Sequence, residues 1–439
     1  PESAGLVSYI RVLRNDISGM GYSGISAHVF AGLGDEQGLE DGVAVESIEI
    51  VDNRIQGNML NEIGTVAPLL RQFIGWGGIA LSICSDATIR DNVISGNGNS
   101  SAEPICGIFL AIAEDVKIER NRIEQNGRQP DSESSLNPGR RGGIIIGIAI
   151  GGLSTYGENP DARRKVDRPA LMVTGNVVDA PNARALKAIT IGPTIVTGNR
   201  LSGAGRSAFA SNLFGSLVVL GLSLSQIGGS ILNPRDEIDL LDYALLELLS
   251  EVLGGDVVNL ISLAVAEDLD LSRGKEGTSF DPQRMSGGEM MVNDNQISLQ
   301  CHSKELPVNL SAVLLLGLDD ISFCDNQAEV ENSITFVLTN ILAIGATLRV
   351  SSNRLQKRLL GGVLSAITLG VMNQTSFNQS THCIFAIAPL PTRYVEGNTA
   401  MVNLISAELC STLDKVAGAL SLNFGRTRGI QSRAFVGGG

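Results

Sequence analysis

Histidine and aromatic residues are scarce in this chain. Of 439 residues, 3 are histidine, 1 is tryptophan and 4% are aromatic. His28, His302 and His382 lie far apart, without the close spacing of a motif-defined metal site. No glycine-rich phosphate loop, nucleophile elbow or HExxH segment occurs either. These absences exclude the common motif-defined nucleotide hydrolases, serine hydrolases and zinc peptidases, and we expect no cofactor.

Cysteine and basic residues are also few. The 6 cysteines include no CxxC pair, so we interpret them as small core residues, with disulfides as the open alternative; they are Cys84, Cys106, Cys301, Cys324, Cys383 and Cys410. There are 46 acidic against 33 basic residues, a net charge of −13. An acidic chain is a poor match for polyanions, so nucleic acid and anionic membranes are not expected partners.

What the chain has in abundance is an internal repeat marked by asparagine. Eleven segments align on Asn15, Asn53, Asn92, Asn121, Asn176, Asn199, Asn295, Asn326, Asn353, Asn378 and Asn398. Three residues before each asparagine stands an apolar residue, with Thr375 as the exception. Most residues two positions after it are apolar too, for example Ile94 and Ile123. Self-similarity of this kind indicates a solenoid.

The period within each unit predicts strands. Val116-Lys117-Ile118-Glu119 alternates apolar and polar residues, which buries one face of a strand and leaves the other wet. We expect the repeated asparagine to occupy the left-handed backbone region at a sharp coil corner. Its amide is expected to bond to the asparagine of the next coil, as in stacked amide ladders.

This pattern resembles the right-handed parallel β-helix repeat of the pectin-lyase-like superfamily. The resemblance covers about residues 6 to 398 and implies an all-β solenoid of about 11 coils with a helical insertion. We divide the chain into N-terminal coils (1–202), an insertion (203–289), C-terminal coils (290–400) and a capping or linker tail (401–439). The fold hosts lyases, hydrolases, adhesins and inert scaffolds, so it does not by itself imply a function.

The insertion is expected to contain an amphipathic helix. Asp236 to Leu253 has acidic residues at its start, an apolar stripe and a Gly254-Gly255 end. Before it, Ser207 to Pro234 carries no charge, and its segment Leu217 to Leu224 fits a coil strand as well as part of a membrane span. We favour the strand and expect no membrane span.

Several strands are apolar on consecutive residues. Gly142 to Gly152 is interpreted as a buried strand pair, and Val313 to Gly317 and Val363 to Leu369 are also continuous runs. Such runs predict that both faces of these strands are covered, by the chain's own helix, a second subunit or another domain. A mean hydropathy of +0.17 agrees with covered outer surfaces.

Candidate binding residues lie in loops inserted between coils. Arg140, Arg141, Arg163, Arg164 and Lys165 are predicted to form a basic patch that binds a uronate, a sulfate or an acidic surface, unless neighbouring carboxylates neutralise it. Trp76, between two glycines, is a candidate platform for stacking a sugar, or an anchor that packs its loop onto the coil.

Catalytic candidates are weaker. Asp319-Asp320 resembles the aspartate pair of polygalacturonases, but the Asn-Thr-Asp and Arg-x-Lys segments of that family are missing. We interpret the pair as turn residues and assign no catalytic or metal-binding residue.

Two hypotheses follow for function. The first is a non-enzymatic structural or ligand- and receptor-binding module of a larger bacterial surface, secreted or tail-like assembly, whose partners are other subunits or domains. The alternative is a lyase or glycoside hydrolase that acts on an acidic polysaccharide. Because Pro1 is not a start residue, we expect a fragment or processed product, with an extracellular or cell-surface location.

Overall fold

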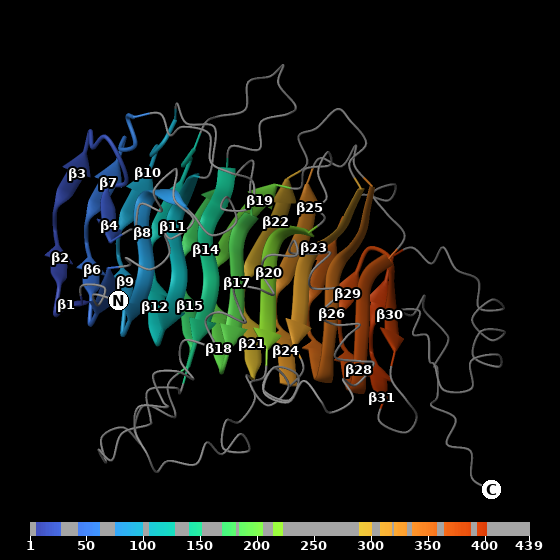
Figure 1. Ribbon diagram of the computed structural model, residues 1–439. Helices are drawn as coiled ribbons and strands as arrows, with labels where there is room; N and C mark the ends of the chain where they lie inside the picture. The colour runs from blue at the N-terminus through green and yellow to red at the C-terminus, as the bar shows by residue number, and fades with distance from the viewer. Residues whose placement is uncertain are drawn as a thin grey trace, which may run out of the picture.

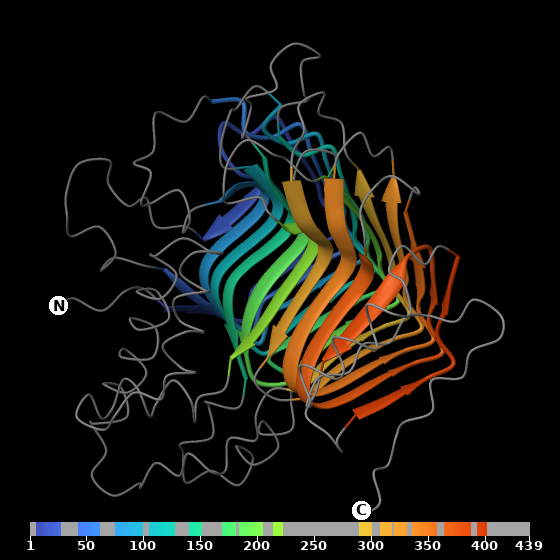
Figure 2. The same cartoon turned by 90° about the vertical axis from the view of Figure 1, so that its right-hand side faces the viewer.

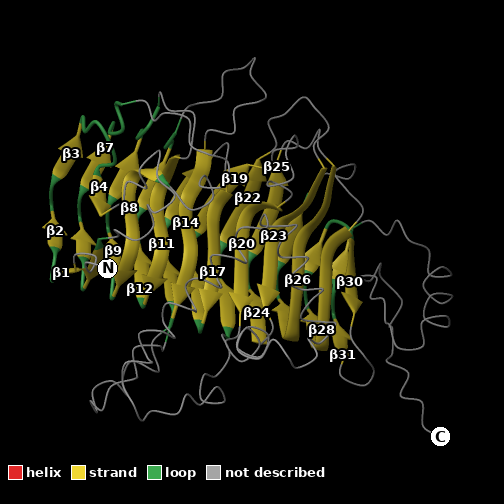
Figure 3. Ribbon diagram, viewed as in Figure 1, coloured by secondary structure: helices red, strands yellow, loops and turns green. Residues whose placement is uncertain are grey.

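The chain winds into a parallel β-helix whose coils contribute strands to two long sheets (Figures 1 and 3). The computed structural model describes residues 6–27, 43–61, 75–99, 105–127, 140–151, 169–180, 184–204, 214–222, 289–300, 308–317, 320–331, 336–357, 364–387 and 393–401. Within these ranges the secondary structure is all strand, with no helix. The prediction of an all-β parallel β-helix is therefore confirmed; the predicted helix at 236–253 lies outside the described residues.

One sheet has 11 strands, one from each coil. It consists of β3 (Asp16–Ser18), β7 (Arg54–Gln56), β10 (Val93–Ser95), β13 (Arg122–Glu124), β16 (Val177–Ala180), β19 (Arg200–Ala204), β22 (Gln296–Gln300), β25 (Gln327–Glu331), β27 (Arg354–Gln356), β29 (Gln379–Ser380) and β32 (Thr399–Ala400).

The other sheet has 21 strands and forms two adjacent faces of the coil, which Figure 2 shows from the C-terminal end. The first face contains β4 (Ile25–Ala27), β8 (Trp76–Ser85), β11 (Ile105–Glu114), β14 (Arg140–Ile150), β17 (Arg184–Ile191), β20 (Phe214–Leu222), β23 (Val308–Gly317), β26 (Phe336–Ser351), β28 (Leu364–Ser376) and β30 (Cys383–Ile387), with β1 (Leu6–Ser8) and β5 (Ala44–Glu46) in line with the end of β8. The second contains β2 (Arg11–Leu13), β6 (Glu49–Val51), β9 (Thr88–Arg90), β12 (Val116–Glu119), β15 (Leu171–Thr174), β18 (Thr194–Thr197), β21 (Met290–Asn293), β24 (Asp320–Cys324) and β31 (Arg393–Glu396). The long strands β26 and β28 continue across both faces.

The alignment made on asparagine is the register of the solenoid. The residues three positions before each asparagine pair in one unbroken column from Val12 to Val395. The residues two positions after it form a second column from Ile17 to Ala400. Both columns face the interior, where one aliphatic cluster extends from Val45 to Ile384.

Thr375, the polar exception in the first column, is fully buried and hydrogen-bonded. Its Oγ1 donates to Asn373 Oδ1 at 2.7 Å and lies 3.0 Å from Thr368 Oγ1. Asn373 Nδ2 donates in turn to the carbonyl of Thr368 at 3.1 Å. The polar side chains therefore satisfy one another in a core that is aliphatic in the earlier coils.

Glycine before the first inward isoleucine of a coil follows from close packing. A Cβ on Gly107 would lie 2.2 Å from Ile123 Cγ2 and 2.8 Å from the carbonyl oxygen of Gly143 in the next coil. A Cβ on Gly143 would lie 2.1 Å from Val178 Cγ1. The first face thus approaches the strands of the 11-stranded sheet closely enough to require glycine at this corner.

Two local expectations were wrong. The left-handed residue at the corner is the one before the asparagine, in all eleven coils; these residues are Arg14, Asp52, Asp91, Arg120, Gly175, Gly198, Asp294, Asp325, Ser352, Phe377 and Gly397, with φ between 51° and 66°. The segment from Gly142 to Ile150 is not a strand pair but belongs to the single strand β14, which pairs along this segment with β11 on one side and β17 on the other.

Within the range 203–289 that we assigned to an insertion, β20 is part of the solenoid. It pairs with β17 on one side and with β23 on the other. The segment Leu217–Leu222 is therefore a coil strand, the interpretation favoured from its sequence. The coils are thus continuous from the N-terminal to the C-terminal set.

Candidate functional site

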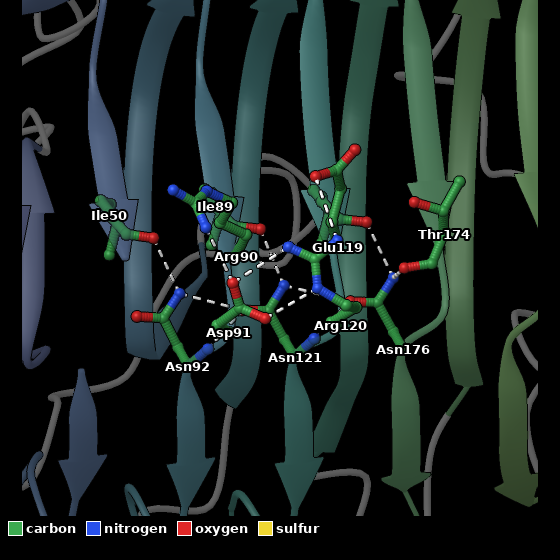
Figure 4. Close-up of polar contacts among 11 residues, drawn as sticks. Ile50, Ile89, Arg90, Asp91, Asn92, Glu119, Arg120, Asn121, Thr174 and Asn176 are labelled. Carbon is green, nitrogen blue, oxygen red and sulfur yellow. Dashed lines mark hydrogen bonds and ion pairs between the residues drawn. The ribbon is translucent and has the colours of Figure 1, made fainter. Parts of the chain in front are cut away.

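Each repeated asparagine bonds to both neighbouring coils. The Oδ1 of Asn121 accepts from Asn92 twice, from the backbone N–H at 3.0 Å and from Nδ2 at 2.9 Å. Its Nδ2 donates backward to the carbonyl of Ile89 at 2.8 Å and forward to Asn176 Oδ1 at 3.1 Å (Figure 4). One amide therefore satisfies two buried backbone groups and links three coils.

This asparagine ladder is continuous through all eleven coils. Its ten Nδ2 to Oδ1 steps measure between 2.8 and 3.2 Å. One step joins Asn199 to Asn295, which are 96 residues apart in the sequence. Every member from Asn53 to Asn398 is 3% exposed or less, whereas Asn15, at the end of the stack, is exposed. Because neutral hydrogen bonds strengthen away from water, burial makes each step a strong tie between coils.

A second, shorter ladder was missed from the sequence. Asn58 Nδ2 donates to Asn97 Oδ1 at 2.9 Å, and Asn97 Nδ2 donates to Asn126 Oδ1 at 2.8 Å. These residues follow Asn53, Asn92 and Asn121 by five positions, so the signal was present as a second asparagine column. We interpreted this second column only as turn residues, because it extends over just three coils.

Charged side chains gather at the left-handed corner of two adjacent coils. Arg120 donates to both carboxylate oxygens of Asp91, from Nε at 2.8 Å and from Nη2 at 3.0 Å, and Arg90 Nη1 donates to Asp91 at 2.9 Å (Figure 4). The hydrogen bond from Arg120 is the main cause that lowers the pKa of Asp91; desolvation opposes it, and the hydrogen bond from Arg90 adds to the lowering. The pair ties neighbouring coils on the outside of the ladder.

The outward side of the first face carries an unusual row of side chains. One residue on each of ten successive strands points away from the core in register; the members are Ser26, Ala80, Phe109, Ile145, Lys187, Val218, Leu314, Leu342, Ile367 and Phe385. We call this set the outer row. Eight of the ten are apolar; the five apolar members up to Leu314 are buried, Leu342, Ile367 and Phe385 are half-buried, and Ser26 at the first strand is exposed. Apolar residues thus occupy outward positions on these strands; what covers them, the chain's own helix, a second subunit or another domain, stays a prediction.

Further exposed apolar side chains lie at the C-terminal coils. Val371 and Met372 on β28 are 61% and 51% exposed, and Phe377, Tyr394 and Met401 are also open to solvent. Exposed large apolar residues grouped on adjacent strands are typical of contact surfaces.

The predicted binding residues are only partly described. Trp76 is the first residue of β8 and pairs with Ile105 on β11. Ile105 pairs in turn with Arg140, the first residue of β14, so Trp76 and Arg140 lie two strands apart on the same side of the coil corner. Trp76 is 6% exposed, an arrangement expected for an indole packed onto the coil, whereas sugar stacking would need the ring uncovered. The side chains of Arg140 and Arg141, and all of Arg163, Arg164 and Lys165, lie outside the described residues.

The aspartate pair is only half described. Asp320 is the exposed first residue of β24 and pairs with Thr347, while Asp319 lies outside the described residues, so the turn interpretation of the pair stays a prediction. His382 is fully buried, and His28 and His302 are not described. Among the residues that the structure describes, no three His, Cys, Asp or Glu side chains are grouped as a metal site would require.

Four cysteines behave as core residues. Cys84, Cys106, Cys324 and Cys383 are buried free thiols. Burial raises the pKa of Cys84 to about 12, so this thiol is neutral and unreactive at physiological pH. Cys301 and Cys410 lie outside the described ranges.

One buried cation lies near the last coils. Lys357 is buried, and its Nζ donates to the carbonyl of Leu364. Desolvation lowers the pKa of this amine to about 7, so part of its population is neutral near physiological pH.

The fold and these contacts define a protein class, the parallel β-helix solenoid. No protein-family model matches the chain, and neither the curated proteins nor the solved structures include a significant match to it. No helix among the described residues is long and apolar enough to cross a membrane.

Removing one buried ladder amide is expected to destabilise the fold strongly. Asn121→Ala removes the side-chain partner of the Asn92 N–H and of the Ile89 carbonyl, and takes one of two donors from Asn176 Oδ1. We expect a loss of about 3 kcal/mol or more in the free energy of unfolding, measured by denaturant titration. The matched control is Asn15→Ala at the exposed end, with an expected loss of about 1 kcal/mol. Equal losses at the two positions would contradict the role of burial.

The Asp91 carboxylate is expected to make a small, pH-dependent contribution to the free energy of unfolding. Since its pKa is lowered in the folded state, its stabilisation is present above the unfolded pKa and disappears as the pH falls through the folded one. Asp91→Asn keeps a residue that tolerates positive φ, and should cost at most about 1 kcal/mol near neutral pH, since the pair is partly exposed. The free energies of unfolding of wild type and Asp91→Asn, measured as a function of pH, should become equal in acid. Asp52→Asn, at the same corner but without a described ion pair, is the control; an equal effect there would refute the assignment.

Proposed function

We propose that this protein is a non-enzymatic β-helix, a rigid structural or ligand- and receptor-binding module of a larger bacterial surface, secreted or tail-like assembly. The observation that carries the proposal is the outer row. A solvated solenoid face alternates apolar-in with polar-out, whereas eight of the ten residues in this outward row are apolar. Its half-buried members Leu342, Ile367 and Phe385 lie on the C-terminal coils and are suited to contact with another protein surface or segment.

The asparagine ladder supports the same role. Stacked repeats are held only by their neighbours, so their rigidity depends on the tie between successive coils. Here each step of the ladder adds side-chain hydrogen bonds to the backbone pairing. The ladder crosses even the step from Asn199 to Asn295, so the coils on both sides act as one rod.

We further propose a relation to the pectin-lyase-like superfamily and an extracellular or cell-surface location. The relation to the superfamily is supported by the repeat of an inward aliphatic residue, a left-handed corner and an asparagine that bonds to its equivalent in the next coil. Binding of acidic glycans is proposed for Arg140, with Arg141, Arg163, Arg164 and Lys165 as further candidate contacts. The support is the position of Arg140 at the start of β14, two strands from the start of β8, where the buried Trp76 packs onto the coil.

The test is an assay for cleavage of acidic polysaccharides. We expect purified protein to release neither reducing ends nor unsaturated products from polyuronates, while X-ray scattering in solution fits a single rigid rod. Asp320→Asn is the matched variant and should be indistinguishable from wild type, since Asp320 is an exposed strand-start residue. Cleavage by wild type that Asp320→Asn abolishes, with unchanged melting, would replace the proposal by the lyase or hydrolase alternative.

A further inference from the structure

A second group of outward apolar residues is confined to three coils of the second face. The residue four positions before each ladder asparagine points outward, and these residues pair in register from Arg11 to Tyr394. In three consecutive coils the residue is apolar; we call Met172, Ile195 and Met291 the second-face patch. Every other member of this row is polar or, in the last coil, Tyr394. Met291 is 36% exposed, and Met172 and Ile195 are half-buried.

The same three coils carry the two long insertions at the corner between the first and the second face. Segment 152–168 leaves after β14 and returns at the start of β15, and segment 223–288 leaves after β20 and returns at the start of β21. Between them, β17 continues into β18 through Gly192-Pro193. In the other coils this connection has at most five residues. The second face is therefore apolar on its outside only where long stretches of chain emerge beside it.

The longer insertion contains an apolar stripe whose spacing matches the patch. The segment 236–253 lies outside the described residues, and its sequence predicts an amphipathic helix. In such a helix Leu241, Leu245 and Leu248 follow one another at rises of about 6 and 4.5 Å. Neighbouring strands are about 4.8 Å apart. A helix that lies across β15, β18 and β21 therefore places one leucine over each residue of the second-face patch.

Charge and length match as well. The segment 236–253 has six carboxylates and no basic residue. In the row of the second-face patch the exposed Lys117 precedes Met172, and the exposed Arg349 lies two strands after Met291. Lys117 and Arg349 are five strand spacings apart, about 24 Å, and a helix of 18 residues is about 27 Å long. Carboxylates near both ends of the helix are thus within reach of a cation.

We propose that the segment 236–253 of this chain docks as a helix across β15, β18 and β21, with its apolar stripe on the second-face patch. The stretch 223–235 is long enough to reach this position, since an extended chain covers about 3.3 Å per residue. Docking removes apolar surface of both the helix and the patch from water. It also leaves the outer row on the first face available to a partner. The inference is independent of the proposed assembly role.

Hydrogen exchange of the intact chain, read by mass spectrometry, tests the docking. In wild type the amides of 236–253 should be protected. Ile195→Glu places a carboxylate in the middle of the patch, and we expect exchange in 236–253 to become at least about tenfold faster. Val177→Glu is the matched control, because Val177 is also an outward strand residue, 40% exposed, but lies on the 11-stranded sheet. It should leave exchange in 236–253 unchanged, and both variants should melt like wild type.

Charge reversal gives an independent readout. Lys117→Glu combined with Arg349→Glu should also speed exchange in 236–253, whereas Lys117→Arg should not. Unprotected amides in 236–253 of wild type, or equal exchange there in Ile195→Glu and Val177→Glu, would overturn the docking proposal. If Ile195→Glu instead lowers the mean mass in sedimentation equilibrium and leaves exchange in 236–253 unchanged, the patch binds a second copy and the proposal is wrong. Neither result bears on the proposed structural role, which polysaccharide cleavage would overturn.

Discussion

The fold depends on the hydrogen bonds that one buried asparagine side chain makes in each coil. A parallel coil must turn sharply at each corner, and a turn leaves backbone groups that no strand pairing reaches. In this protein the side chain of one asparagine per coil supplies those bonds: its oxygen accepts the N–H of the previous asparagine and its nitrogen reaches a strand carbonyl. The same amide also bonds to the asparagine of the next coil. The side chain that satisfies the backbone groups of the corner therefore also attaches the next coil. An isolated coil cannot make these bonds, and the stability of each coil therefore depends on its neighbours.

This dependence explains why the coil register could be predicted from the sequence. The asparagine is required at one position, and its spacing to the inward residues is fixed by the short strands, so aligning the asparagines also aligned Val12 with Val395 and Ile17 with Ala400. The long gaps between Asn121 and Asn176 and between Asn199 and Asn295 did not hide the repeat. The ladder steps across these two gaps have the same hydrogen bonds as the others.

The errors have the same physical origin. Asparagine was assigned the left-handed conformation because that is its usual property, but here its side chain must point inward to bond, and the residue before it takes the positive φ. The position before the asparagine faces outward and is occupied by residues as different as Arg14, Asp91, Phe377 and Gly175. No single residue type therefore marks it in the sequence. The Arg120–Asp91 ion pair joins residues 29 positions apart, and strand pairing places Arg140 two strands from Trp76; both follow from the register only after the stack is known.

The sequence indicated apolar outward side chains but not what covers them. Continuous apolar strands indicated two covered faces, and the outer row is the outward one of these. Which segment or partner contacts it is a question of tertiary and quaternary arrangement, and short-range periodicity contains no such information. The directionality of the ladder is also invisible in sequence, because donor and acceptor reside in the same asparagine side chain and only the coordinates show which way each amide points.

The most direct test of the central claim is hydrogen exchange measured on the coils that flank the longest gap. If the ladder joins Asn199 to Asn295, backbone amides of β18, β19, β21 and β22 should exchange as slowly as those of β12 and β13, with one common rate-limiting opening. Protection that is strong within 171–204 and within 290–331 but arises from separate openings of different free energy would show two independent stacks. That result would contradict a single rod built on one continuous asparagine ladder.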